Sequence, residues 1–402
     1  MSTKPIIGIA GFGMEGKAAY EYFKDKAELH IFDEAPVDAA GLTAAVHRGL
    51  DIPADIETLY KTPGIPTSKL RLASPATYVT TLTDLLLSRV HAQAVGVTGT
   101  KGKSTVAALV HHIMKGAGRD VELLGNIGVV NVSIIDAPIP GRVYVFELSS
   151  YQCEYLKHSP HVAVLTNLYQ EHLSHHGSFE RYREAKLNIA RFQSEKDVFI
   201  NGTDLEPGFR GRVVRPKSST SFETQLLGEH NQRNCALAVA AVGALGISEA
   251  EACEHIKTFA PLQYRLEKIG EHRGATFYDD SLATIPEATL ASIAALGRVD
   301  TLILGGQDRG IDFAGAAEAL ARTPVKTFII FPDTGARMTE HINDREVLPV
   351  FSMEEAVRAA YAHTPEGGVV LLSNASPSFN LFKDYKDKSA QYRKWIVELA
   401  NA

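Results

Sequence analysis

Residues 92–104 read Ala-Gln-Ala-Val-Gly-Val-Thr-Gly-Thr-Lys-Gly-Lys-Ser and decide the fold of the chain. Residues 92–97 form the apolar run of a buried strand, and the helical pattern of residues 105–115 follows directly. Glycines between a strand and a helix let the backbone curl around phosphates, and a helix N-terminus and a lysine bind them as well. The hydroxyl of the serine is suited to a magnesium ion that accompanies the phosphates. The strict P-loop spacing requires a glycine five residues before Gly102, where this sequence has Val97, so the loop is a variant of that motif. The stretch predicts a nucleoside triphosphate site.

Strand-like and helix-like segments alternate along the rest of the chain. Strands are expected at 143–147, 162–166, 198–200, 275–278, 301–304, 326–330 and 368–372. Such alternation predicts mainly parallel sheets that are covered on both faces. The sequence therefore predicts an α/β protein.

The N-terminal residues carry a second glycine signature. The apolar run 5–10 leads into Gly-Phe-Gly-Met-Glu-Gly at 11–16, a helical segment at 17–25 and a strand at 28–33 that ends in Asp33. This order is the fingerprint of a dinucleotide-binding fold, and the alternative is a plain tight turn between strand and helix. We expect a Rossmann-like domain at 1–89, a P-loop ATPase domain with a parallel sheet at 90–260, and a Rossmann-like domain at 261–402.

Composition limits the class of partner. The 402 residues are 45% hydrophobic and 22% charged, and 41 Lys and Arg against 47 Asp and Glu give a net charge of −6. These values are typical of globular proteins, and they lack the basic surface of a nucleic-acid binder. The first residues do not have the pattern of a secretory signal, and no stretch of 18 apolar residues occurs in the sequence. The three cysteines are scattered, so they fit neither a disulfide framework nor a zinc site. We expect a cytoplasmic monomer that binds small molecules and has no nucleic-acid or membrane partner.

An acid for the metal of a nucleotide site is expected at a neighbouring strand end. Glu147 closes the predicted strand 143–147 and fits this role beside the Ser104 hydroxyl. A buried acid is costly unless it is paired or bound to metal. The alternative is a hydrogen-bonded structural glutamate.

Six segments in order resemble the Mur ligases of peptidoglycan synthesis. They are residues 98–104, 125–128, 147–152, 166–172, 185–186 and 228–234. Within that family, the segment 147–152 and the stretch 371–385 are most similar to the branch that adds D-glutamate to UDP-N-acetylmuramoyl-L-alanine. The resemblance implies that ATP phosphorylates the substrate carboxylate, the amine of the amino acid attacks the acyl phosphate, and amide, ADP and phosphate result.

The resemblance also implies cofactors and catalytic residues. ATP and two magnesium ions are expected, with Lys103 on the β- and γ-phosphates. Ser104 and Glu147 would hold the first magnesium ion. His172 would hold the second, together with Lys186, whose side-chain amine the family carries as a carbamate. From composition alone Lys186 would be a helix-surface lysine, and Arg265, which the family directs to the γ-phosphate, would form a surface salt bridge. The implied catalytic set is Lys103, Glu147, His172, Lys186 and Arg265.

The implied binding residues fall into two further sets. For ATP they are Thr98, Gly99, Thr100, Lys101, Gly102, Lys103, Ser104, Thr105, Asn231, Asn234, Arg265 and Asp280; for the UDP substrate they are Met14, Glu15, Asp33, Glu34, Thr62, Asn126 and His172. His230, Asn231 and Asn234 are expected in a turn before a helix at 235–245, with an N-cap as the alternative role of Asn234. His175 and His176 are expected to be solvated loop residues.

The third domain departs from the family pattern where the amino acid binds. Leu282 and Ile285 stand where the D-glutamate ligases have lysine and asparagine. The implied amino-acid set is Thr284, Arg309, Ser378 and Tyr385. D-glutamate, L-glutamate and other amino acids all stay open, as does a folylpolyglutamate-type ligase, and the non-enzymatic alternative is a P-loop switch.

Overall fold

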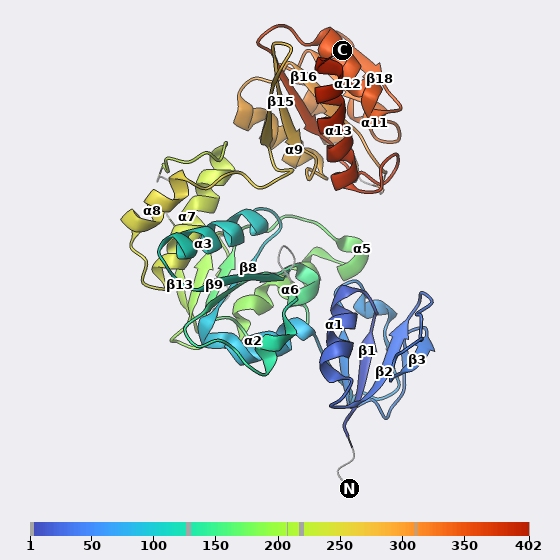
Figure 1. The fold of residues 1–402 in the computed structure, drawn as a ribbon, viewed down its shortest axis with the longest axis vertical. Coiled ribbons are helices and arrows are strands. Elements are labelled where there is room, and N and C mark those ends of the chain that lie inside the picture. The colour runs from blue at the N-terminus through green and yellow to red at the C-terminus, as the bar shows by residue number, and fades with distance from the viewer. Residues whose placement is uncertain are drawn as a thin grey trace. The chain divides into compact units, whose positions relative to one another are not determined.

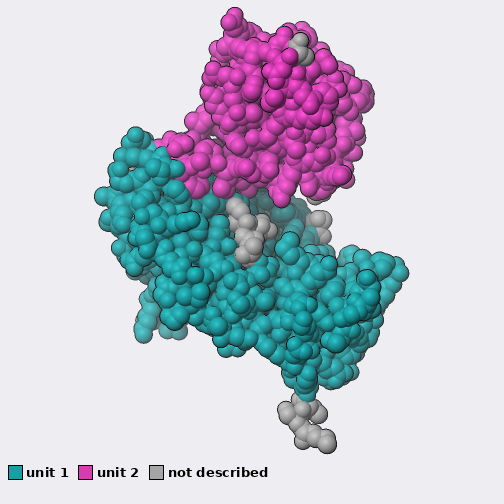
Figure 2. Space-filling model, in the orientation of Figure 1, with its two compact units in different colours: residues 1–223, 232–258 teal, residues 224–231, 259–402 magenta. Residues whose placement is uncertain are grey.

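The computed structural model describes residues 4–125, 130–206, 208–216, 221–308, 310 and 312–401. Figure 1 shows its alternating strands and helices along the chain. The chain divides into two compact units (Figure 2). Unit 1 comprises residues 1–223 and 232–258, and unit 2 comprises residues 224–231 and 259–402.

The N-terminal part of unit 1 has a five-stranded parallel sheet. Its order is β3 (Ala45–Arg48), β2 (Glu28–Asp33), β1 (Ile6–Ala10), β5 (Thr58–Lys61) and β7 (Tyr78–Thr80). Helix α1 (Met14–Phe23) packs on β1 and β5. The predicted succession of strand, glycine turn, helix and acid-terminated strand is therefore confirmed.

The second sheet of unit 1 has six parallel strands. Its order is β13 (Arg212–Val214), β12 (Val198–Asn201), β11 (Val162–Leu165), β8 (Ala94–Thr98), β10 (Val143–Glu147) and β9 (Val121–Gly125). Helix α3 (Lys103–Gly116) packs on β8, β9 and β10, and α6 (Phe179–Arg191) packs on β8 and β11. These strands are nearly continuous apolar runs because both faces of a parallel sheet are buried.

Unit 2 contains a six-stranded mixed sheet. Its order is β14 (Glu267–His272), β15 (Ala275–Asp280), β19 (Val369–Ser373), β16 (Thr301–Leu304), β17 (Thr327–Ile330) and β18 (Glu346–Pro349). Only the pair of β14 and β15 is antiparallel among these described strands. The last strand of the chain, β19, is thus central, between β15 and β16.

The remaining elements connect these sheets or cover them. Helix α2 (Leu82–Val90) places Leu86, Leu87 and Val90 in one apolar cluster with Tyr144 and Phe146. None of the helices in the described ranges has both the length and the apolar character that crossing a membrane requires. The other elements are β4 (Asp51–Ile52), β6 (Arg71–Leu72), α4 (Ser150–Cys153), α5 (Leu173–His176), α7 (Glu229–Gly243), α8 (Glu249–Lys257), α9 (Pro286–Leu296), α10 (Ala314–Ala321), α11 (Gly335–Met338), α12 (Met353–His363), α13 (Tyr385–Ala400) and the 3-10 turns at Thr67–Lys69, His91–Gln93 and Val132–Ile135.

The predicted α/β class with parallel sheets is confirmed by this architecture. Each predicted domain range, 1–89, 90–260 and 261–402, contains one large sheet. The contacts nevertheless group the first two sheets in one unit and assign residues 224–231 to the other. The three domain limits stay a prediction.

Candidate active site

The glycine loop between β8 and α3 has the backbone geometry that its sequence requires. Gly99 and Gly102 have φ angles of +147° and +82°, which other residues rarely adopt. A Cβ atom at Gly102 would lie 2.5 Å from Asn234 Oδ1, and one at Gly99 would lie 1.9 Å from Thr166 Oγ1. Helix α3 begins at Lys103, two residues earlier than predicted, so Lys103 and Ser104 lie in its first turn.

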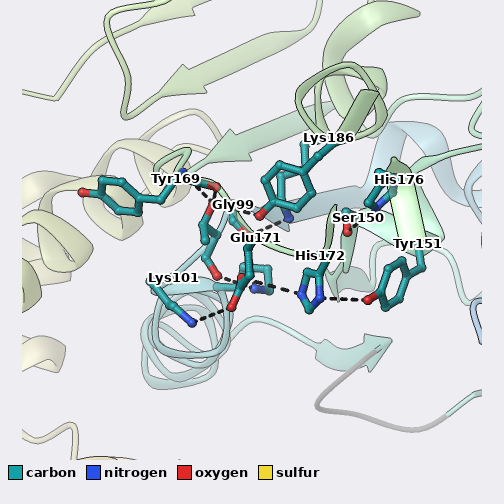
Figure 3. Close-up of polar contacts among 12 residues, drawn as sticks. Gly99, Lys101, Ser150, Tyr151, Tyr169, Glu171, His172, His176 and Lys186 are labelled. Carbon is teal, nitrogen blue, oxygen red and sulfur yellow. Dashed lines mark hydrogen bonds and ion pairs between the residues drawn. The ribbon is translucent and has the colours of Figure 1, made fainter. Parts of the chain in front are cut away.

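Two lysines converge on this loop. Lys103 Nζ donates hydrogen bonds to the carbonyl oxygens of Gly99 (3.1 Å) and Thr100 (2.9 Å). Lys186 Nζ, on α6, donates to the carbonyl oxygen of Gly99 at 2.7 Å (Figure 3). Lys186 is 1% exposed, so the alternative of a helix-surface lysine is wrong. Burial, and secondarily the charge of Lys103, lowers the pKa of Lys186 to about 7.

Figure 3 also shows a series of polar contacts that runs from Lys101 through Glu171 and His172 to Tyr151. Lys101 Nζ is 2.8 Å from Glu171 Oε1, and Glu171 Oε2 is 3.6 Å from His172 Nε2. His172 Nδ1 is 2.8 Å from the Tyr151 hydroxyl, and the backbone of His172 is left-handed at φ +56°. Burial lowers the pKa of His172 and outweighs the opposing charge of Glu171. The imidazole is thereby favoured in its neutral form, which is the form that ligates metals.

The strand-end acid lies where the sequence predicts it. Glu147 is buried at the carboxyl end of β10 and pairs in register with Val97 of β8, the strand that leads into the glycine loop. Ser104 is buried in the first turn of α3. Carboxylate and hydroxyl oxygens are the hard ligands that magnesium prefers, so this pair fits the implied ion.

His175 and His176 are not the solvated loop residues that the sequence suggested. Both belong to α5, and their rings pack against Tyr151 with centroids 4.1 and 5.6 Å apart. His176 is 4% exposed, and its Nε2 lies 3.0 Å from Ser150 Oγ. The prediction failed because this burial comes from tertiary packing on aromatic rings.

Glu154, His175 and His176 form a cluster whose possible ligand atoms lie within 4.8 Å of one another. His175 Nε2 is 3.5 Å from Glu154 Oε2. The buried ammonium of Lys61 is 3.3 Å from the same oxygen, and Thr67 donates to the other at 2.8 Å. Lys61 therefore already supplies a cation to this carboxylate.

The predicted UDP-substrate residues surround the N-terminal glycine turn. Asp33 accepts hydrogen bonds from the backbone N–H groups of Phe12 (2.7 Å) and Ala35 (2.8 Å). The Thr62 hydroxyl donates to the carbonyl oxygen of Ala10. Both side chains thus hold the turn itself, and their contact with a substrate stays a prediction.

The other members of that set have different surroundings. Glu15 accepts a hydrogen bond from Gln152 Nε2 at 2.9 Å, and burial raises the pKa of Glu15. Glu34 forms an exposed ion pair with Lys69, and Met14 is 77% exposed. Asn126 lies outside the described residues.

The predicted turn before residue 235 is part of helix α7, which begins at Glu229. His230, Asn231 and Asn234 are therefore helical, and the N-cap alternative for Asn234 is wrong. Gly228, at φ +92°, ends the preceding segment and lets the helix begin there. Asn231 Nδ2 donates to the carbonyl oxygen of Leu227, and Asn234 lies against Gly102.

In unit 2 the predicted residues gather after β15 and β19. Asp280 ends β15 and accepts hydrogen bonds from Ser292 Oγ (2.7 Å) and Ser373 Oγ (2.9 Å), and burial raises its pKa to about 6. Ser378 is buried, Thr284 is half-buried, and the ring of Tyr385 is 5.4 Å from that of Tyr264. Arg309 lies outside the described residues, and the role of Arg265 stays a prediction.

Sequence reasoning missed two aromatic residues of the site. The Tyr182 hydroxyl is 2.8 Å from Thr100 Oγ1, and Lys186 Nζ is 4.9 Å from the Tyr182 ring. Their spacing of four residues on one helix face is a signal that could have found Tyr182. Tyr151 belongs to a quoted motif, but its contact with His172 links segments 21 residues apart.

Comparison with known proteins identifies the family. The model described as Mur ligase middle domain matches residues 97–210, and the one described as Mur ligase, glutamate ligase domain, matches residues 264–375. A UDP-N-acetylmuramoyl-L-alanine--L-glutamate ligase of Salinispora tropica is 34% identical over 98% of this chain and 98% of its own length. The chain belongs to the Mur ligase family. As a Mur ligase it is an ATP-dependent enzyme that forms an amide bond.

Other Mur ligases cover the chain to a similar extent. A UDP-N-acetylmuramoylalanine--D-glutamate ligase of Nitratidesulfovibrio vulgaris is 31% identical over 98% of this chain and 96% of its own length. The crystal structure of MurF ligase from Thermotoga maritima in complex with ADP superposes with a TM-score of 0.61 at 16% identity, covering 98% of this chain and 96% of that one. The family resemblance of the sequence motifs is thus confirmed, and the Mur ligase fold with it.

Proposed function

We propose that this Mur ligase adds glutamate to UDP-N-acetylmuramoyl-L-alanine in cytoplasmic peptidoglycan precursor synthesis. The observation that carries the proposal is the convergence of Lys103 and the buried Lys186 on Gly99, in a chain whose full-length relatives are named as glutamate ligases. A plain P-loop switch gives no reason for a deeply buried lysine behind the loop.

The phosphate end of ATP is assigned to the glycine loop. Backbone N–H groups of residues 99–102 and the N-terminus of α3 would cradle the phosphates, with Lys103 on the β- and γ-phosphates. Ser104 and Glu147 would hold one magnesium ion, and His172 and Lys186 a second. When bound, the ions would neutralise the negative charges of the ATP phosphates and of the substrate carboxylate that approaches them. Asn231, Asn234, Arg265 and Asp280 are assigned to ATP as well.

Lys186 would act as a carbamate. Its neutral amine nitrogen attacks the carbon of CO2, a C–N bond forms as one C–O π bond breaks, and one proton leaves to solvent. A lysine with a pKa of about 7 is substantially neutral near physiological pH, which this addition requires. The product is an anion in place of a cation, beside Lys103 and next to a metal site.

We assign the acceptor to the first and central domains, and the amino acid to the third domain, of a three-domain enzyme. Met14, Glu15, Asp33, Glu34, Thr62 and Asn126 would meet the UDP portion, and His172 the carboxylate end. Thr284, Arg309, Ser378 and Tyr385 would bind the amino acid. We further propose that the enzyme is a monomer, for which size-exclusion chromatography with light scattering is the test.

The amino acid we propose is L-glutamate. Relatives from Salinispora tropica and Micromonospora that carry L-glutamate in their names are 34% and 32% identical over 98% of this chain. Leu282 and Ile285 depart from the pattern of the D-glutamate branch at the site assigned to the amino acid. Both observations favour the L enantiomer.

The test is phosphate release from ATP and magnesium with UDP-N-acetylmuramoyl-L-alanine and L-glutamate, D-glutamate or no amino acid, with the product mass measured. We expect release and a glutamyl product with L-glutamate. Release with D-glutamate alone would overturn the enantiomer and retain the ligase. Release with neither, but with a folate acceptor and glutamate, would overturn the acceptor and favour a folylpolyglutamate-type ligase.

A further inference from the structure

Two buried polar atoms on the residues directly after β15 and β19 of unit 2 lack a hydrogen-bond partner in the described ranges. They are Asn374 Oδ1 and Ser281 Oγ, on residues that are 0% exposed. Leaving a buried acceptor unpaired costs free energy, and such groups often mark functional positions. The edge they occupy is where open α/β sheets bind ligands.

Asn374 joins three loops of this edge. It follows β19, the strand between β15 and β16. Its Nδ2 donates to the carbonyl oxygen of Ser281, after β15, at 2.6 Å, and to Ser378 Oγ, on its own loop, at 3.0 Å. The backbone carbonyl oxygen of Asn374 accepts a hydrogen bond from the backbone N–H of Gly305, after β16, at 2.9 Å. Two of these loops carry Thr284 and Ser378, which are assigned to the amino acid.

The orientation of the amide follows from its partners. The carbonyl oxygen of Ser281 can only accept a hydrogen bond, so the amide nitrogen must face it. The same nitrogen donates to Ser378 Oγ, which therefore acts as acceptor toward Asn374. The hydrogen of the Ser378 hydroxyl is then left for another acceptor, such as a carboxylate.

We propose that Asn374 is a positioning residue for the amino-acid site. It fixes the Ser378 hydroxyl as a donor to the glutamate carboxylate and holds the loop of Thr284 against the loop of Ser378. This inference rests on the proposed function. It adds a residue directly after the central strand β19 that orients an anionic amino acid without touching it.

The test compares Asn374→Asp with Asn380→Asp. Asn380 is comparable because its Nδ2 also donates to a backbone carbonyl, that of Pro332, at 3.2 Å, and its Oδ1 is also buried without a partner among the described residues. Asn380 is half-buried, whereas Asn374 is 0% exposed. Asn380 makes no described hydrogen bond to Ser378. In Asn374→Asp an oxygen replaces the amide donor, so the Ser378 hydroxyl would donate to the introduced carboxylate instead of to glutamate.

Phosphate release is measured against glutamate at saturating ATP and acceptor. For Asn374→Asp we expect the KM for glutamate to rise roughly tenfold or more, because one hydrogen bond to a charged group of the substrate is lost. The KM for ATP should stay within about threefold of wild type, as should kcat. Asn380→Asp should change none of the three beyond that range. Asn374→Ser, which removes the amide without adding charge, gives the same test if Asn374→Asp does not fold.

A double-mutant cycle separates positioning from general damage. In a Ser378→Ala background, Asn374→Asp should raise the KM for glutamate by less than about threefold, because its effect passes through the Ser378 hydroxyl. Equal increases in both backgrounds, or equal losses in kcat and in the KM for ATP, would overturn the inference. Wild-type enzyme that shows no glutamate-dependent release would instead overturn the proposed function, so the two failures are distinct.

Discussion

The buried amine of Lys186 allows a direct test of the carbamate. We expect Lys186→Ala to lower turnover at least a hundredfold, because the anionic ligand is lost, and enzyme stripped of CO2 to regain activity when bicarbonate is added. The measurement is phosphate release, with far-UV circular dichroism as a check of folding. Lys115→Ala, an exposed lysine of α3, is the control and should keep wild-type turnover. Wild-type turnover in Lys186→Ala would contradict the carbamate.

Glu154 is expected to make unfolding pH-dependent. Burial raises its pKa, but His175, Lys61 and Thr67 outweigh that effect and lower it to about 2, from 4.5. A carboxyl group whose pKa is lower in the folded than in the unfolded state stabilises the fold above pH 4.5. This contribution to the free energy of unfolding is lost as the pH falls from 4.5 toward 2. At pH 7 we expect Glu154→Gln to lower the free energy of unfolding by roughly 1 to 3 kcal/mol, because it removes the carboxylate charge 3.3 Å from the buried Lys61 ammonium.

Thermal unfolding at pH 7 and pH 3.5 measures this effect. The midpoint gap between wild type and Glu154→Gln should narrow at the lower pH, because the unfolded wild-type carboxyl takes up a proton there. Glu21→Gln, which removes an exposed ion pair with Lys24, should shift the midpoint little at either pH. A gap that is equal at both pH values would show that the carboxylate charge of Glu154 does not stabilise the fold.

The glycine loop is the element whose geometry is most sensitive to one added methyl group. Gly102→Ala would place a Cβ 2.5 Å from Asn234 Oδ1 and in a left-handed backbone, and we expect it to weaken ATP binding at least tenfold. Gly118→Ala is the control, because Gly118 also has a positive φ, +71°, but nothing lies within 4 Å of its Cβ position. Calorimetric titration with ATP and magnesium measures both. Equal affinities would mean that the loop does not need its glycine at 102.

Element by element, the sequence predicts what continuous apolar runs determine. Strands such as β8 and β10 were placed within one or two residues because their runs are buried on both faces. Strand β14 was not expected, since Glu-Lys-Ile-Gly-Glu-His at 267–272 carries no such run and is placed by pairing with β15. The start of α7 was missed because His230, Asn231 and Asn234, in its first turns, are weaker helix formers than the alanines that follow.

In the active site, predictability depended on sequence distance. The turn at Gly99 and Gly102 and the start of helix α3 at Lys103 are local features, so the motif alone indicates them. The burial of Lys186 behind Gly99, 87 residues away, and of His176 against Tyr151 arises only when separate strands and helices pack. Composition gave the opposite answer for both side chains. For Lys186 the family resemblance supplied what physical reasoning on the sequence could not.

The apolar cores of the molecule separate along the chain. The described apolar clusters of unit 2 contain residues from Leu266 to Leu399 alone, all within 259–402. We expect a fragment of residues 259–402 to fold by itself and to unfold cooperatively in urea, followed by circular dichroism. A fragment of 259–368 lacks β19 and α13 and should not fold. Absence of a cooperative transition in the longer fragment would show that residues 259–402 need another part of the chain to fold.

The place of β19 in the middle of its sheet has a consequence for biosynthesis. A ribosome makes β15 and β16 long before residues 369–373, so both strands wait with open edges for the partner that will separate them. Unit 1 can fold while synthesis continues, whereas the sheet of unit 2 can close only after β19 has emerged from the exit tunnel. We therefore expect the nascent residues 267–368 to be the part of this enzyme that most needs protection from wrong strand pairing during synthesis.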